Sequence, residues 1–405
     1  MKICLLCSAH EPYDKRVYHK IGLSLAAAGH DITVIAPGGQ RHVSAAGISI
    51  LPYTGKRRTI HRWWSLLPRA ASLLNMFRLA LRSRADAYQC NEPDSWLIGL
   101  LVKLVRVGCP RVVFDVHEDY PSTLAESFPL PIRSLLERLV RRVMRLMARF
   151  TDRLVLTRAS LDDQIFAGTR VAKMVLPNCS RVPADPSLIR EMRTAARSID
   201  QPLCAIHVGR MTVGRGSEQL LDALVNLRAG NREVRIVFVG GFFRKGMRDR
   251  QYEVAYLERA SRGGVADWIR IVDWVAFERV PEFLLSADLG LITFLPSRKN
   301  TYWGLPHKLF DYMSYALPVI APDHPEIARV VNRHRCGVLI DPTDPRAIAD
   351  ALSYFCDRPD EGRSMGLRGL DAVVEEYNWD KQVKKLLAVY RAWDEAIRKS
   401  TPTRG

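Results

Sequence analysis

The chain has 405 residues, with 60 Lys and Arg against 43 Asp and Glu, a formal net charge of +17 and a pI near 9.7. This length exceeds that of one typical core and predicts two domains of ordinary size. The positive excess favours an anionic partner, whether nucleic acid, a phosphorylated substrate or an acidic membrane surface. The first residues turn polar too soon for a signal peptide, and no apolar run reaches the ~18 residues of a spanning helix. We therefore expect a cytoplasmic protein.

The eight cysteines are scattered through largely apolar runs. Cys4 and Cys7 form a CxxC pair inside an expected strand, where side chains three apart face opposite ways. A zinc site would need a second ligand pair, and a redox motif would begin a helix. We expect buried thiols in a reducing cytoplasm and no metal site.

Strand and helix patterns alternate along the chain. A buried run at 2–8, helical spacing up to Gly29 and a strand at 31–36 predict a parallel sheet with right-handed crossovers. The pattern recurs after a polar, proline-containing stretch at 182–201, where we place the domain boundary. A helix should begin at Asp344-Pro345 by the N-cap and first-turn proline rule. The prediction is α/β, with two doubly wound Rossmann-like domains facing a central cleft, and ligands at the carboxyl ends of the strands.

Residues 304–320, GLPHKLFDYMSYALPVI, predict a helix start followed by a buried strand. With Pro306 as the first helical residue, the N–H groups of His307 and Lys308 point out of the helix and favour an anion. Asp311 shares a helix face with both. This arrangement suits the diphosphate and sugar of a nucleotide sugar. An ordinary capped surface helix with a Lys/Asp pair fits the same pattern.

A second basic loop, HVGRMTVGRG at 207–216, follows a strand and precedes a helix. Its glycines allow close backbone approach, and Arg210 and Arg215 offer forked donors suited to phosphate oxygens. It is neither a P-loop nor a GxGxxG fingerprint. A basic surface turn is the alternative interpretation. His207, on an apolar strand, is more typical of a hydrogen-bonded core histidine.

These two segments, in this order, resemble the nucleotide-binding domain of family 4 glycosyltransferases, which are retaining enzymes of the GT-B fold. The resemblance covers nearly the whole chain. It includes CLLCSAHEPYDKRVYHKIGLSLAAAGHDITVIAP at the start and the later segments FDVHEDYP, VLPN, DWVAFERVPEFLLSADLGLI and YNWDKQVKKLL. It implies an acceptor-binding domain at 1–185, a nucleotide-sugar-binding domain at 186–380 and a C-terminal helix at 381–405 returning to the first domain.

The resemblance also implies the site. Arg210 and Arg215 would clamp the donor diphosphate, and Asp311 would accept hydrogen bonds from the ribose. His117 would lie beside the donor sugar. Around the donor, the implied binding residues are Gly209, Gly304, Leu305, Pro306, His307 and Lys308.

The implied reaction is metal-independent transfer of a sugar, of hexosyltransferase type, with retained configuration and no cofactor besides the nucleotide-diphosphate sugar. Charge would build on the departing diphosphate, which Arg, Lys and helix amides would stabilise. The chain departs from the family at Trp303, which stands where many members carry the first of two glutamates. Either this branch relies on the amides of residues 305–308, or the chain is an inactive sugar-nucleotide-binding or scaffold subunit.

In the first domain, residues 10–16 follow the first strand and should face the cleft. Asp14 and Arg16 are candidates for contact with the acceptor or the donor sugar, and His10 is a weaker one. An N-cap and its neighbour would give the same pattern for Asp14 and Arg16.

Two basic amphipathic stretches, 56–84 with its Trp63-Trp64 pair and 131–150, favour contact with an anionic membrane. Helices that pack their apolar face on the sheet explain part of both. We expect peripheral association with the inner face of the plasma membrane and a lipid-linked or saccharide acceptor. Nucleic acid is disfavoured because aromatic residues do not interleave as stacking platforms. A nucleotide-dependent oxidoreductase is disfavoured because the first strand lacks a glycine fingerprint.

Overall fold

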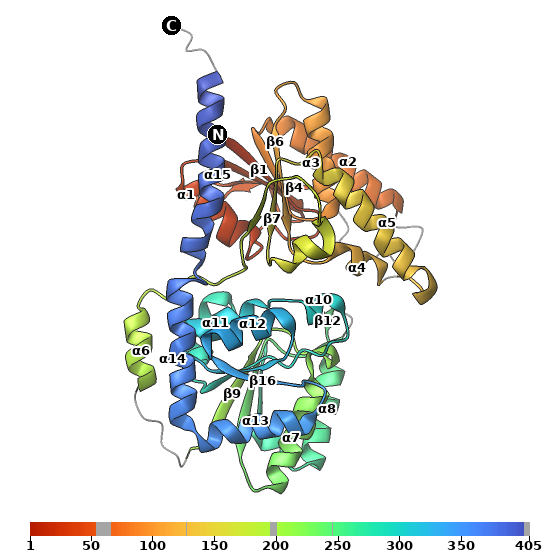
Figure 1. The fold of residues 1–405 in the computed structure, drawn as a ribbon. Coiled ribbons are helices and arrows are strands. Elements are labelled where there is room, and N and C mark those ends of the chain that lie inside the picture. Colours follow the sequence, from red (N-terminus) through yellow and green to blue (C-terminus); the bar gives the residue numbers. More distant parts are fainter. Residues whose placement is uncertain (54–65, 127, 195–200, 245, 401–405) are drawn as a thin grey trace. The chain divides into compact units, whose positions relative to one another are not determined.

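The computed structural model describes residues 1–53, 66–126, 128–194, 201–244 and 246–400 (Figure 1). They form two compact units: unit 1 is Met1–Asn178 together with the chain from Asp380 onward, and unit 2 is Cys179–Trp379. The chain thus enters unit 2 earlier than the predicted division after residue 185. Cys179 is buried in the core of unit 2 and Val182 packs against that core, so these residues already belong to it.

Unit 1 is built on an eight-stranded sheet in the order β3-β4-β2-β1-β5-β6-β7-β8, parallel except for the β3–β4 pair. The strands are β1 Lys2–Leu6, β2 Asp31–Pro37, β3 His42–Val43, β4 Ser49–Tyr53, β5 Ala87–Cys90, β6 Arg111–Val116, β7 Arg153–Leu156 and β8 Lys173–Val175. Several are buried on both faces, as expected for parallel strands between two helical layers. Cys4 and Cys7 lie buried there as free thiols, and burial raises the pKa of Cys4 to about 12.

Helices cover both faces of this sheet. They are η1 Val17–Gly22, α1 Leu23–Ala27, α2 Leu66–Ser83, α3 Pro93–Val105, α4 Tyr120–Ala125, α5 Leu130–Ala148, η3 Asp162–Phe166 and α15 Trp379–Ser400. One core joins α2, α3 and α5 to the sheet through Met76, Trp96 and Met144. The C-terminal helix α15 packs on the same unit, where the Tyr390 hydroxyl donates to Gln89 Oε1 over 2.9 Å (Figure 1).

Unit 2 has a six-stranded parallel sheet in the order β13-β10-β9-β14-β15-β16. Its strands are β9 Leu203–Val208, β10 Val234–Val239, β13 Ile269–Val272, β14 Leu289–Leu291, β15 Val319–Pro322 and β16 Gly337–Ile340, with a separate hairpin of β11 Phe243–Arg244 and β12 Met247–Arg248. Two layers of helices sandwich the sheet, which makes this unit doubly wound as predicted.

The helices of unit 2 are α6 Pro186–Thr194, η4 Val213–Arg215, α7 Ser217–Ala229, α8 Arg250–Arg262, η5 Ala266–Trp268, η6 Phe277–Arg279, α9 Val280–Leu285, α10 Lys299–Tyr302, α11 His307–Ser314, α12 Pro325–His334, α13 Pro345–Asp357 and α14 Pro359–Glu375. Most of them connect its strands, while α6 precedes β9 and α13 and α14 follow β16. The start of α13 is confirmed, since Asp344 caps it by accepting from the N–H of Arg346 with Pro345 following.

The polar stretch 182–201, where the sequence places the domain boundary, has a structure that the sequence pattern did not predict. It contains helix α6, whose Ile189 is buried against Ala316 and Leu370. Arg193, near the end of α6, donates to the carbonyls of Leu284, Ala287 and Tyr315. A helix that is anchored by one apolar residue and one arginine has a mostly polar sequence, which is why no helical pattern indicated it.

Candidate functional site

The loop after β9 is shaped by glycines that adopt left-handed backbone. Gly209 has φ +101° and Gly216, which precedes α7, has φ +79°. A Cβ on Gly216 would lie 2.2 Å from the carbonyl oxygen of Thr293, on the segment after β14. The Thr293 hydroxyl donates to the carbonyl of Arg215 over 2.7 Å. The loop is therefore fastened to the neighbouring strand at the carboxyl edge of the sheet, where ligands bind in open α/β sheets.

Three cationic side chains meet at this edge. The guanidinium of Arg215 lies 5.2 Å and the Nζ of Lys308 5.0 Å from the ring centroid of Phe294, while Arg210 lies 5.1 Å from that of Phe243. Arg215 also donates to the carbonyl of Arg210. Cation–π contacts and a backbone acceptor hold these groups without neutralising them. The arrangement leaves a concentration of positive charge that an anionic ligand can satisfy.

The buried pair Lys308 and His207 is the innermost part of this cluster. Lys308 is only 8% exposed, and its Nζ lies 3.0 Å from Nε2 of His207, which is fully buried. Burial and the nearby Arg215 lower the pKa of Lys308 well below its usual value, and Asp311 counteracts this in part. Burial, Lys308 and Arg215 likewise lower the pKa of His207. A neutral imidazole that accepts a hydrogen bond from Lys308 fits both shifts.

The helix start predicted at Pro306 is displaced by one residue. Pro306 is the N-cap of α11, with extended backbone at φ −75° and ψ 144°, and His307 is the first helical residue. No side chain caps this end, so the first amides of the helix have no side-chain acceptor at the N-cap. Leu305 packs on the core of unit 2. A Cβ on Gly304 would lie 2.4 Å from the carbonyl oxygen of Asn300, which explains why glycine stands there.

Asp311 lies one turn into α11, and its Oδ1 accepts from the hydroxyl of Ser180. Trp303 ends the short helix α10 directly before Gly304, and its ring packs edge-on against Tyr302 at 5.6 Å. The structure thus brings Gly209, Arg210, Arg215, Lys308 and Asp311 together on unit 2, with Trp303 at the entrance to α11.

In unit 1, the predicted residues Arg16 and His117 both bind the carboxylate of Asp115, a residue that the sequence motifs did not single out. Arg16 forms a two-pronged pair with Asp115, with Nε–Oδ2 and Nη2–Oδ1 distances both of 2.8 Å. His117 Nε2 lies 3.1 Å from Asp115 Oδ2. Asp115 is fully buried, which alone would raise its pKa, but Arg16 and His117 hold the pKa well below its usual range. The guanidinium of Arg16 is itself 3% exposed. Contact between Arg16 and an acceptor stays a prediction.

A second imidazole–carboxylate pair adjoins the first. His10 Nδ1 is hydrogen-bonded to Glu92, and the His10 and His117 rings meet edge-on with centroids 4.9 Å apart. Glu92 also accepts from the backbone N–H groups of Ser8, Ala9 and His10. Burial would raise the pKa of Glu92, but these hydrogen bonds and the His10 side chain lower it to about 2. Burial would lower the pKa of His10, and the Glu92 contacts raise it above its usual value instead.

Asp14 binds backbone N–H groups of its own segment. Its Oδ1 accepts from the N–H groups of Arg16 and Val17 over 2.8 and 3.0 Å, so it caps the helical segment that follows. A contact between Asp14 and the acceptor stays a prediction.

Asp115 could have been found in the sequence, because a carboxylate within the apolar strand VVFDV must have a buried partner. Glu92 gives a weaker signal, as an acid directly before Pro93 at a helix start.

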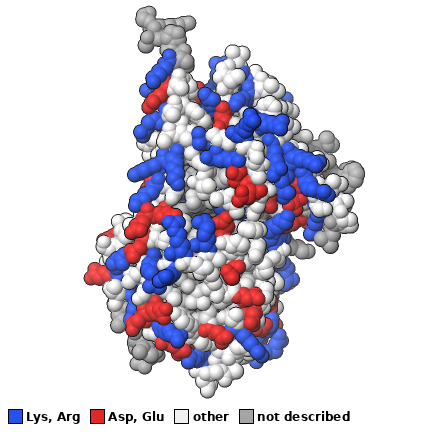
Figure 2. Space-filling model, viewed as in Figure 1, with Lys and Arg blue, Asp and Glu red and all other residues white. Residues whose placement is uncertain are grey.

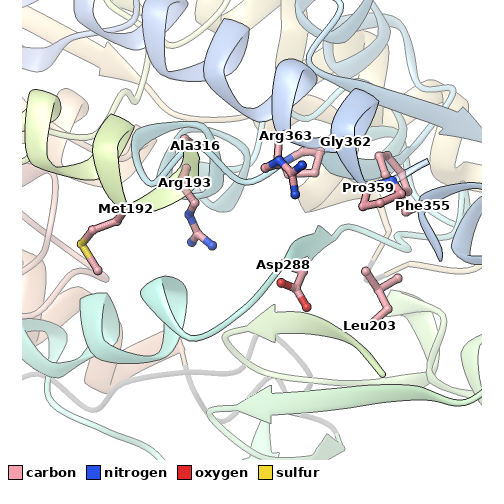
Figure 3. A pocket seen from close by; sticks show the side chains of 10 residues that line it. Met192, Arg193, Leu203, Asp288, Ala316, Phe355, Pro359, Gly362 and Arg363 are labelled. Carbon is pink, nitrogen blue, oxygen red and sulfur yellow. The ribbon is translucent and has the colours of Figure 1, made fainter. Parts of the chain in front are cut away.

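A small cavity of about 180 Å³ lies elsewhere in unit 2 (Figure 3). Leu203, Asp288 and Pro318 line it at the amino ends of β9, β14 and β15, so it opens at the sheet edge opposite the cation cluster. Its charged groups already serve the fold, since Asp288 accepts from the N–H of Cys204 and Arg193 binds three carbonyls. This cavity is not the predicted donor site.

Two family descriptions match the chain. Residues 15–198 match "Glycosyltransferase Family 4", and residues 203–358 match "Glycosyl transferases group 1". The first covers most of unit 1 and the second most of unit 2, including the cation cluster.

Among curated proteins, the chain is 27% identical over 264 residues to a D-inositol 3-phosphate glycosyltransferase of Corynebacterium kroppenstedtii, covering 62% of this chain and 55% of that protein. It is 24% identical over 220 residues to a GDP-mannose-dependent alpha-(1-6)-phosphatidylinositol monomannoside mannosyltransferase of Mycobacterium tuberculosis, covering 53% of this chain and 54% of the relative. The chain spans about half the length of these two relatives.

Solved structures share the fold over nearly the whole chain. Sucrose-phosphate synthase of Thermosynechococcus elongatus superposes with a TM-score of 0.77 at 15% identity, covering 98% of this chain and 100% of that one. HepE of Anabaena, solved with UDP, superposes with a TM-score of 0.71 at 15% identity over 97% and 100%. Two Rossmann-like units, the matched family descriptions and these neighbours agree: the chain belongs to glycosyltransferase family 4 and has the GT-B fold.

Proposed function

We propose that this protein transfers a sugar from a nucleotide-diphosphate sugar to an acceptor, with retention of configuration and without a metal ion. The observation that carries the proposal is the cluster of Arg210, Arg215 and Lys308 at the carboxyl edge of the unit 2 sheet. A diphosphate supplies the negative charge that this cluster lacks. Relatives named for transfer from GDP-mannose, and a structural neighbour solved with UDP, support a nucleotide-sugar donor.

In the proposed reaction the bond between the anomeric carbon and the diphosphate breaks through an oxocarbenium-like transition state. The oxygen of an acceptor hydroxyl forms the new bond to that carbon, and its proton passes to the leaving diphosphate. In the transition state, negative charge builds on the leaving diphosphate, and Arg210, Arg215 and Lys308 stabilise it together with the first amides of α11. Because these groups are held in place beforehand, their electrostatic effect costs little reorganisation. The carboxylate of Asp311 accepts hydrogen bonds from the ribose hydroxyls. Gly209 has no side chain and so allows the backbone to approach the ligand closely.

On unit 1, the proposed acceptor residues are His117, oriented by Asp115, and the neighbouring His10, oriented by Glu92. With Nε2 of His117 on Asp115 and Nδ1 of His10 on Glu92, each ring has one nitrogen that is not engaged by its carboxylate. Such nitrogens suit sugar hydroxyls. Two relatives are named for acceptors that carry an inositol phosphate or a phosphatidylinositol mannoside. We therefore propose a saccharide or a lipid-linked saccharide as acceptor.

A donor-binding screen tests this function. Thermal unfolding of the purified protein is followed with UDP-, GDP- and ADP-sugars in the presence of EDTA. A ligand at about 100 times its dissociation constant stabilises the folded state by roughly 2.7 kcal/mol. We expect a shift with one nucleotide class that Arg210→Ala abolishes and that Arg235→Ala, an exposed arginine on β10, preserves. No shift with any nucleotide would refute the donor site. Binding without release of nucleotide when acceptors are added would instead indicate the inactive alternative raised by Trp303.

We also propose that unit 1 associates peripherally with an anionic membrane from the cytoplasmic side. Helix α5 supports this, because Leu135, Leu139 and Leu146 are 63%, 54% and 52% exposed, and together with Ile132, Val143 and Phe150 they form one row by helical spacing. Lys and Arg side chains spread over the same unit (Figure 2). No helix in the described ranges has the length and apolar character needed to span a bilayer.

The other predicted basic stretch, 56–84, behaves differently. Residues 54–65, which include Trp63 and Trp64, lie outside the described part of the chain. In α2, Met76 and Ala80 are buried and Leu73, Phe77 and Leu81 pack against the core, so that apolar face is largely used within the fold. Flotation with anionic vesicles should therefore weaken in Leu139→Ser and persist in Leu188→Ser, a similarly exposed leucine on α6. Equal flotation of both variants would contradict a role for α5.

A further inference from the structure

A groove of about 970 Å³ lies between the second half of α5 and the segment that leads into β8. Four arginines line it: Arg142, Arg145 and Arg149 from α5 and Arg170 from the segment before β8. Thr151, two residues before the start of β7, also lines it. The groove is therefore at the amino edge of this sheet, whereas His117 follows the carboxyl end of β6. It is distinct from the acceptor residues proposed above.

The arginines of the groove form no ion pair with any residue that the structure describes. Arg145 is anchored, because its Nε donates to the carbonyl of Ile165 over 2.7 Å. Arg142, Arg149 and Arg170 are exposed, and the described ion pairs do not include them. The nearest carboxylates in sequence bind other cations: Glu137 pairs with Arg141, and Asp162 with Lys173. Several guanidinium groups thus line one concave surface without an ion-pair partner among the residues that the structure describes.

The groove is continuous with the apolar row of α5. Leu146 belongs to both, since it lines the groove and is 52% exposed. Phe150, 62% exposed, follows one turn later. Arg138, Arg142, Arg145 and Arg149 are spaced so that they run along α5 beside the apolar row. Helix α3 adds apolar surface at this end, because Lys103 on α3 donates to the carbonyl of Phe150 and Leu104 is 80% exposed.

From this juxtaposition we propose that the groove binds the phosphate of an anionic glycerophospholipid, whose acyl chains lie along the exposed apolar row of α5. Forked guanidinium donors match the geometry of phosphate oxygens. The apolar row beside them favours an amphiphile over a free phosphate, because only an amphiphile covers Leu139, Leu146 and Phe150 while it neutralises the arginines. The inference deepens the proposed membrane contact: it makes one lipid head group a specific ligand of unit 1.

A soluble short-chain lipid separates this site from general attraction to a charged surface. Dihexanoyl-phosphatidylglycerol is titrated into the full-length protein below its micelle concentration, and binding is followed by calorimetry. We expect saturable binding of one lipid per chain. Loss of one charge-assisted hydrogen bond in Arg149→Gln or in Arg170→Gln should weaken it by about tenfold or more. Arg138→Gln removes the same charge from the same helix outside the groove and should change the affinity by less than about twofold.

Each other outcome overturns the inference. Wild-type protein that does not bind the short-chain lipid has no head-group site, and equal weakening in Arg138→Gln means that only the net charge matters. Inorganic phosphate or short-chain phosphatidylcholine that binds as tightly as the phosphatidylglycerol rules out an anionic lipid as the specific ligand. Because Arg170 is on a loop and Arg149 is at a helix end, concordant losses with unchanged melting temperatures exclude misfolding. The nucleotide-sugar shift measured on the same variants should be intact, so failure here leaves the proposed transferase function standing.

Discussion

The Nζ of Lys308 lies 3.0 Å from Nε2 of His207, with both side chains buried beneath the surface that carries Arg210 and Arg215. Burial, together with the positive charge of Arg215 close by, lowers the pKa of Lys308 and the pKa of His207. Without a bound anion, the charged form of Lys308 is therefore unfavourable in the folded protein. A bound diphosphate would stabilise that charged form. This relationship leads to two predictions about protons.

The first concerns stability in acid. The pKa of His207 is held well below 6.5 in the folded protein, so below about pH 6.5 the unfolded chain binds a proton that the folded chain does not. This site therefore makes the free energy of unfolding fall as the pH decreases, by up to about 1.4 kcal/mol per pH unit. Urea unfolding from about pH 7.5 to about pH 5.5 should show a flatter profile in His207→Gln than in wild type. Parallel profiles would contradict the assignment.

The second concerns proton uptake on donor binding. An anion beside Lys308 favours its charged form and raises a pKa that burial and Arg215 have lowered. At pH values between the free and the bound pKa, binding of the nucleotide should therefore take up protons, to a maximum of about one per site from this group. Calorimetry in two buffers of different ionisation enthalpy measures this number. Lys308→Met should lose the uptake, and an uptake that persists in that variant would assign it to another group.

The third tests the loop that carries Arg215. Gly216→Ala places a Cβ 2.2 Å from the carbonyl oxygen of Thr293, at a φ of +79°. Left-handed backbone alone costs an alanine about 1–2 kcal/mol, and the clash adds to it. We expect a lower melting temperature and loss of the nucleotide-induced shift. Gly214→Ala is the matched control, because its nearest neighbouring atom is 3.8 Å away. Similar behaviour of the two variants would contradict the described loop geometry.

The fourth tests the buried pair in unit 1. Asp115→Asn leaves the guanidinium of Arg16 buried without its counter-charge, which should destabilise the protein by roughly 3–5 kcal/mol. The double variant Arg16→Met with Asp115→Leu removes both charges and should cost clearly less. Urea unfolding of the three proteins compares these free energies. A double variant less stable than Asp115→Asn would show that the pair itself contributes net stability.

The sequence predicted the architecture because parallel α/β domains have strong local sequence patterns. Buried strands appear as continuous apolar runs, such as 203–208 and 318–321, and helix starts appear as caps, such as Asp344 before Pro345. Elements with weak local patterns were not predicted, or were predicted with a shifted start. Helix α6 is mostly polar, and Pro306 proved to be the cap of α11 and not its first residue.

For the donor site, spacing identified Gly209, Arg210, Arg215, Lys308 and Asp311, and the structure places these residues together on unit 2. Spacing did not reveal that Lys308 turns inward to His207, nor that Phe294 lies against both Lys308 and Arg215. Those contacts join strands β9 and β14 to helix α11. Residues so far apart in the chain leave no periodic signal of their pairing.

On its own, then, the sequence determined the class of fold, the family and the positions at strand ends where charged side chains gather, because each depends on local order along the chain. Only the tertiary structure decided which of these charges are buried and paired. It placed Asp115 between Arg16 and His117. It also buried the apolar face of α2 in the core, whereas α5 packs on the core through Met144 and leaves a second apolar row, with Leu139 and Leu146, exposed. Two helices with the same amphipathic pattern differ in this way because burial depends on what packs against them, and packing partners come from distant parts of the chain.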